Sequence, residues 1–292
     1  MPFLECYFYS VVAAWAVGAE AFYYPPNVGY NIGTEDSPNS YMLEIHYDNP
    51  KGIEGRKDSS GLRFFYTSNI RKYDAGILLV GEASLPYFVI PPKQKTWMTV
   101  GYCPKECSEE SLKSTKLPEK GINVFAAFLH THLQGRGIWT KHVRDGVELP
   151  EIARDDNYDF NFQDIQVLKD EVHVKPGDDL MTYCKYQTMD KDKMVVGGTA
   201  TSQEMCLSML FYYPRMVKEP SCNSIQYKPV HEFIGKYFPY LKPHVKSLHY
   251  NPLVAMNITW TEEMASDLRR GYEQGETLIP TCKHQWVSRL MV

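Results

Sequence analysis

The sequence lacks the features that mark several common protein classes. It has no excess of basic residues, because 31 Lys and Arg stand against 35 Asp and Glu for a net charge of -4. This balance argues against nucleic-acid binding. It has no CxxC pair, which argues against zinc ribbons and thioredoxin-type redox motifs. It also has no apolar run long enough to span a bilayer, no internal repeat and no low-complexity tract. What remains is 292 residues of ordinary globular composition, 43% hydrophobic and 23% charged.

Cysteine is present in moderate number. The seven cysteines are Cys6, Cys103, Cys107, Cys184, Cys206, Cys222 and Cys282. Six of them, together with the glycosylation sequon at Asn257, indicate three disulfides and an oxidising compartment. The alternative is six buried free thiols in a cytosolic protein. We therefore predict a location in the secretory pathway, either the endoplasmic reticulum, a secretory vesicle or the extracellular space.

The N-terminal apolar run from Phe8 to Val17 resembles a signal peptide only superficially. Glu5 precedes it, and no Lys or Arg does, whereas secretory signals carry a positive leading region. We instead predict a buried helix over Val11 to Ala21.

The rest of the chain favours an all-β fold. Aromatic residues make up 13% of the sequence, with 21 Tyr, and such residues are enriched in strands. Strands are predicted over 41–47, 62–68, 76–80, 87–90, 96–102, 122–132, 138–144, 165–174, 180–187 and 204–213, with a hairpin turn at Asp145-Gly146. Short strands separated by turn residues predict antiparallel β-sandwiches. The segment from Trp260 to Tyr272 has helical signals, so the tail is predicted to be partly helical.

The strongest chemical signal is His130-Thr131-His132 at the end of an apolar strand. Residues i and i+2 of a strand face the same way, so both imidazoles can reach one metal ion. The alternative is a pair of exposed strand-end histidines. Met205 on a later strand offers a soft thioether that selects copper, although a strand Met is usually core packing. His46 is a further candidate, with a satisfied buried histidine as its alternative.

Several motifs in order resemble the copper type II ascorbate-dependent monooxygenases. They include Leu43-Glu-Ile-His-Tyr47, Leu129-His-Thr-His-Leu133, Gly197-Gly198, Glu204-Met-Cys206, Val12-Ala-Ala-Trp-Ala16 and Ala21-Phe-Tyr-Tyr-Pro25. The resemblance is closest to the dopamine β-hydroxylase branch, and within it to the DBH-like monooxygenase type. It extends from about residue 11 to about 215, and more loosely to Cys282.

The resemblance implies two antiparallel, jelly-roll-like sandwiches with one copper on each. It implies a monooxygenase that uses ascorbate as reductant and O2 as co-substrate to hydroxylate a C–H bond of a small molecule. By the match, His130, His132 and Met205 hold the oxygen-side copper. His46 is the remnant of the electron-entry copper site.

The resemblance also implies a domain division and a disulfide pattern. Residues 1–74 are the C-terminal part of the first sandwich, 75–222 the second sandwich, and 223–292 a disulfide-tethered tail. The expected bridges are Cys103–Cys222, Cys107–Cys282 and Cys184–Cys206. The cysteines that the branch uses between subunits are absent, so no interchain disulfide is expected.

The sequence departs from the family at two kinds of position. The family's His-His pair is absent, so we expect an N-terminally truncated chain with one copper; the alternative function is a catalytically impaired copper-binding protein. Peptidylglycine members carry an Arg where this chain has Phe128 and a Tyr where it has Met209. These differences favour a hydrophobic, aromatic amine over a glycine-extended peptide.

Overall fold

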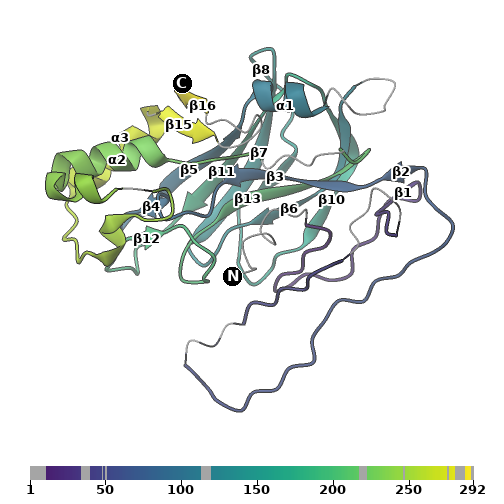
Figure 1. Ribbon diagram of the computed structural model, residues 1–292, viewed down its shortest axis with the longest axis horizontal. Helices are drawn as coiled ribbons and strands as arrows, with labels where there is room; N and C mark the ends of the chain where they lie inside the picture. The colour runs from purple at the N-terminus through teal and green to yellow at the C-terminus, as the bar shows by residue number, and fades with distance from the viewer. Residues whose placement is uncertain are drawn as a thin grey trace.

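The structure is a computed structural model, and it describes residues 11–33, 40–47, 49, 51–112, 120–216, 222–245, 247–274, 276–279 and 287–290. Its centre is a pair of packed β-sheets, with two helices at one end (Figure 1). The first sheet has the strand order β10-β6-β13-β3-β14. The second has the order β5-β11-β7-β8, with β9 paired to β7. The predicted all-β sandwich with a short helical tail is confirmed.

The bounds of the elements follow the turn residues of the sequence. The first sheet consists of β3 (Gly76–Glu82), β6 (Ile122–His130), β10 (Ile165–Val174), β13 (Cys206–Tyr213) and β14 (Cys222–Ser224). The second consists of β5 (Trp97–Cys103), β7 (Gly135–Arg144), β8 (Val147–Glu148), β9 (Ala153–Asp155) and β11 (Asp179–Tyr186). Two-stranded pairs are formed by β1 (Val28–Gly29) with β2 (Tyr73–Asp74), β4 (Val89–Ile90) with β12 (Val195–Val196), and β15 (Glu276–Ile279) with β16 (Val287–Leu290).

The helical elements cover the ends of the sandwich. They are α1 (Lys105–Leu112), α2 (Tyr227–Tyr237), η2 (Pro239–His244), η3 (Pro252–Ala255) and α3 (Glu262–Gln274). The helix expected over Trp260 to Tyr272 is present as α3. No helix among the described residues is long and apolar enough to cross a membrane.

One turn illustrates how the sequence determines the sheet. Asp145 and Gly146, between β7 and β8, have φ of 52° and 77°. Positive φ at both central residues is the signature of the type I′ hairpin, which Asp-Gly favours. The predicted hairpin turn is confirmed, and β7 and β8 pair antiparallel across it.

Two disulfides connect the two sheets. Cys103 at the end of β5 bonds to Cys222 at the start of β14. Cys184 on β11 bonds to Cys206 at the start of β13. Both expected bridges are thus present in the structure. Cys107 is disulfide-bonded too, and its expected partner Cys282 lies outside the described residues.

The N-terminal segment is where the structure differs most from the sequence-based expectation. The helix predicted over Val11 to Ala21 is wrong, because residues 11–28 form an extended strap across the outer face of the first sheet. Phe22 packs on Phe211 with ring centroids 5.0 Å apart, and Gln163 N donates to Val17 O at 2.9 Å. Gly18 has φ of 93°, and a Cβ there would lie 2.5 Å from Asn161 O. This close contact with the loop between β9 and β10 goes with an extended course of the segment, not a helical one.

Residues 40–47, 49 and 51–72 are exposed and belong to no strand or helix (Figure 1). The strands predicted over 41–47 and 62–68 are wrong, because neither segment pairs with a described strand. Their alternating apolar residues are therefore exposed, as Leu43 at 57% and Phe65 at 87% show. Alternation alone does not make a strand, since a strand needs a partner for its backbone hydrogen bonds.

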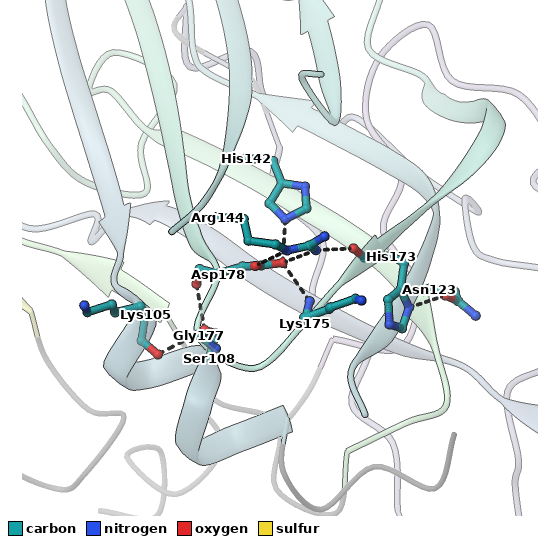
Figure 2. A network of polar contacts seen from close by, with 9 residues as sticks. All are labelled: Lys105, Ser108, Asn123, His142, Arg144, His173, Lys175, Gly177 and Asp178. Atoms are coloured by element: carbon teal, nitrogen blue, oxygen red, sulfur yellow. Dashed lines mark hydrogen bonds and ion pairs between the residues drawn. The ribbon is translucent and has the colours of Figure 1, made fainter. Parts of the chain in front are cut away.

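A buried polar network joins β7, α1 and the turn before β11 (Figure 2). Asp178, 1% exposed, accepts hydrogen bonds from Arg144 Nε at 2.7 Å, Arg144 Nη2 at 2.7 Å and Lys175 N at 2.7 Å. His142 Nε2 lies 2.6 Å from its carboxylate, and Ser108 Oγ of α1 donates to its carbonyl at 2.6 Å. Burial opposes ionisation of Asp178, but these hydrogen bonds outweigh it and hold the pKa below its usual range. The network thus ties α1 and the β10–β11 turn to the second sheet.

Candidate functional site

A β-bulge sets the direction of the histidine pair. β6 pairs Ala126 with Phe211 of β13, but the next pair is Val124 with Tyr212, so one residue, Phe125, is extra. The bulge reverses the alternation of β6 from that point on. Leu129 faces the core between the sheets, while Phe128 faces the outer surface. His130 follows Phe128 on the same outer face, and their rings lie 6.0 Å apart.

His130 is held by Gln163, which lies just before β10. Its Nδ1 lies 2.6 Å from Gln163 Oε1, and Gln163 Nε2 donates to Phe160 O at 2.8 Å. The amide orientation assigns the proton to Nδ1, because Oε1 can only accept. Nε2 of His130 is then left as the basic nitrogen. Burial, followed by the nearby His132, lowers the pKa of His130 to about 4, so the imidazole is neutral at pH 7.

His132 is oriented in the same way by the backbone of another segment. Its Nδ1 lies 3.0 Å from Gln203 O, a carbonyl that can only accept, so Nε2 is again the basic nitrogen. Burial lowers its pKa, and the bond to Gln203 partly opposes this. The two imidazole centroids lie 5.1 Å apart. Between them, Thr131 O accepts a hydrogen bond from Tyr158 Oη at 2.6 Å. This bond fixes residues 130–134, the histidine turn.

Met205 lies directly before β13, on the segment that contacts the histidine pair. Leu207 is the cross-strand partner of His130, and Gln203 holds His132, so Met205 lies between two anchors of the same turn. Its carbonyl accepts a hydrogen bond from Tyr186 Oη at 2.7 Å, and the next residue is held in the Cys184–Cys206 disulfide. The structure therefore brings the three predicted oxygen-side residues to one end of the first sheet.

His46 lies on the exposed loop and forms an ion pair with Glu44. It is close enough to contribute to the lowered pKa of both His130 and His132. Within the described ranges, no three His, Cys, Asp or Glu side chains gather as a metal site. Among the described residues, the Met205 thioether is the candidate third ligand for a site at the histidine pair.

Sequence reasoning missed the residues that orient the ligand candidates. Gln163, Tyr158 and Glu204 are buried and hydrogen-bonded to the histidine turn. Of these, only Glu204 belongs to a motif that the sequence analysis recognised, and no positioning role was predicted for it. Gln163 is 33 positions from His130 and follows no pattern that a single sequence would reveal.

The donor set suits copper. Two neutral imidazoles with free Nε2 atoms and one thioether form a mixed ligand set that copper accepts, whereas zinc prefers a third His or a carboxylate. The surroundings are apolar on the outer face, where Phe128 is buried opposite the half-buried Met209. The site thus combines a soft metal-binding set with a hydrophobic rim.

Comparison with known families identifies the family of this fold. Residues 73–233 match the model of the copper type II ascorbate-dependent monooxygenase C-terminal domain, and residues 2–54 match that of the N-terminal domain. The chain belongs to the copper type II ascorbate-dependent monooxygenase family, an enzyme family that depends on copper and ascorbate.

Individual relatives place the similarity within the family. The chain is 50% identical over 223 residues to human DBH-like monooxygenase protein 1, covering 76% of this chain and 36% of that protein. It is 47% identical to the mouse protein of the same name, over 76% of this chain and 36% of that protein. It is 45% identical to dog dopamine beta-hydroxylase, over 78% of this chain and 35% of that protein. The match spans about a third of the length of these curated relatives.

Proposed function

We propose that this chain carries the oxygen-side half of a copper- and ascorbate-dependent monooxygenase, with His130, His132 and Met205 as the copper ligands. The observation that supports it most is that the two histidines have the same tautomer. Gln163 and Gln203 O each contact an Nδ1, so Nε2 is the basic nitrogen of both rings. Low histidine pKa values keep both rings in the neutral form that a metal requires.

Copper, when bound, supplies the activation of O2 and the one-electron chemistry of C–H hydroxylation. The protein's part is to hold and orient. Gln163 and Tyr158 fix the histidine turn, and the outer face beside His130 excludes water with Phe128 and Met209. Because Phe128 is uncharged and cannot hold a substrate carboxylate, the proposed substrate is a small hydrophobic, aromatic amine.

We propose His46 as the remnant of the electron-entry site, on the part of the chain assigned to the first sandwich, residues 1–74. Residues 75–222 would form the oxygen-side domain and 223–292 the tail. A single His gives a weak copper site, so one copper per chain is expected. An oxygen-side site without its electron partner motivates the alternative, a copper-binding protein that is impaired in turnover.

Copper stoichiometry tests the proposal. The purified, copper-reconstituted protein should bind about one copper per chain by metal analysis. His130→Ala combined with Met205→Ala should abolish this binding, while His249→Ala, an exposed histidine remote from the turn in sequence, should not change it. Retention of copper by the double variant would refute the ligand set.

Turnover is a separate measurement. Ascorbate-dependent oxygen consumption with an arylethylamine would support the enzyme, whereas full copper loading without turnover would support the impaired alternative. A value near two coppers per chain would mean that His46 has recruited other ligands.

We also propose a secretory-pathway location. It is supported by the two inter-sheet disulfides and by the exposed position of Asn257 in the loop between η3 and α3. Protein from a secretory expression host should lose mass on glycosidase treatment, and Asn257→Gln should remove that shift. If neither glycosidase treatment nor Asn257→Gln changes the electrophoretic mobility of the protein, the secretory-pathway location is contradicted.

A further inference from the structure

Glu204 joins the two segments of the candidate site through one carboxylate. Its side chain is fully buried. Oε2 accepts hydrogen bonds from His132 N at 2.8 Å and Met205 N at 3.2 Å, and Oε1 accepts from Gln134 N at 2.6 Å. Two of these donors belong to the histidine turn and one to the methionine.

These donors lie outside the strand ladders. β6 ends at His130 and β13 begins at Cys206, so strand pairing fixes neither His132 nor Met205. Buried backbone N–H groups need an acceptor, and Glu204 supplies one to both segments.

We propose that Glu204 is a positioning residue that sets the distance between His132 and Met205, and so determines whether the thioether reaches a copper held by the two histidines. This inference rests on the proposed function. Glu204 contacts no ligand side chain; it acts through the backbone of two ligand residues. Its loss should therefore let the two segments move relative to one another, so that the thioether no longer reaches a copper bound by the imidazoles, whose Nδ1 atoms keep their contacts to Gln163 and Gln203 O.

The test is X-ray absorption of the protein loaded with Cu(I), together with Cu(I) affinity by competition with a chelator. Glu204→Ala should lose the copper–sulfur contribution, keep two copper–nitrogen contributions and bind Cu(I) about 10–100-fold more weakly. Glu204→Gln keeps one acceptor oxygen but turns an NH2 toward the donors. Its loss of copper–sulfur signal and of Cu(I) affinity should therefore be smaller than that of Glu204→Ala. Combining Glu204→Ala with Met205→Ala should add nothing to the sulfur loss of Met205→Ala alone.

Glu82→Gln is the matched control. Glu82 is as buried as Glu204 and lies on β3 opposite Cys206, and among the described residues its side chain makes no hydrogen bond to the histidine turn or Met205. It should keep the copper–sulfur signal. Equal loss of that signal in Glu82→Gln would overturn the proposal, as would wild-type sulfur coordination in either folded Glu204 variant. If Glu204→Ala does not fold, Glu204→Gln decides alone.

A metal-free measurement separates this inference from the proposed function. In the copper-free protein, amide hydrogen exchange of residues 130–134 should be faster in Glu204→Gln than in Glu82→Gln, because the amide replaces one of the two oxygens that accept from His132 N and Gln134 N. Unchanged exchange would overturn the positioning role. A wild-type protein that binds copper without sulfur would overturn the ligand set instead.

Discussion

Asp178→Ala should lower the free energy of unfolding by about 3–5 kcal/mol, because it leaves Arg144 and His142 without their shared buried carboxylate. Removing one partner of a buried charge network costs far more than an exposed substitution, since the remaining groups stay desolvated and unpaired. The measurement is equilibrium denaturation at pH 7. Asp170→Ala, at an exposed position on β10, is the control and should change stability by less than about 0.5 kcal/mol.

The same carboxylate predicts a pH dependence. The pKa of Asp178 is lower in the folded protein than its ordinary value of 3.8, so the unfolded chain binds more protons between the two values. Its contribution to stability is therefore complete above the unfolded pKa and is lost as the pH falls through the folded one. Asp178→Asn should flatten the fall in stability below about pH 5. A variant that keeps the wild-type acid profile would show that other carboxylates control it.

Replacing Cys103 and Cys222 together by Ser should cost about 5 kcal/mol, because that bridge closes a separation of 119 residues. The matched pair is Cys184→Ser with Cys206→Ser. It closes a separation of 22 residues and should cost about 3 kcal/mol. Both bridges connect the same two sheets, so the comparison isolates loop length. Denaturant titration of the two double variants would give the order, and a reversed order would mean that native packing, not chain entropy, sets the cost.

The sandwich itself could be read from sequence because its signals are local. The strands from Gly76 onward carry their apolar residues and turns in the chain, and Asp145-Gly146 encodes its own backbone conformation. Helices α1 and α2 were not predicted. α2 contains Pro229 in its first turn, and α1 is a short, polar helix, so neither has a clear helical signal.

The predictions for the N-terminal segments were wrong for a different reason. Residues 11–28 have an apolar pattern that suits a helix, yet Phe22 and Tyr24 contact Phe125, whose position on the outer face no local rule reveals. Residues 41–47 alternate as a strand does but have no described neighbour with which to pair. In both cases tertiary partners decide the conformation.

The candidate site was identified in part. The HxH spacing and the methionine motif indicated the candidate ligand residues. The hydrogen bonds that hold these residues, from Gln163 to His130 and from Glu204 to His132, join positions that are distant in the sequence. Single-sequence reasoning has no access to such pairs, because hydrogen-bond partners across a fold leave no periodic trace.

The extra residue at Phe125 determines the face of β6 on which His130 lies. Before it, Ile122 and Val124 face the core, and a regular strand would send His130 the same way. Straightening this bulge with the number of residues unchanged would turn His130 into the space between the sheets, whereas deleting one residue between Val124 and Ala127 would remove the bulge and keep His130 on the outer face. The bulge, and not the residue types of β6, therefore determines which face of the strand carries the first histidine of the pair.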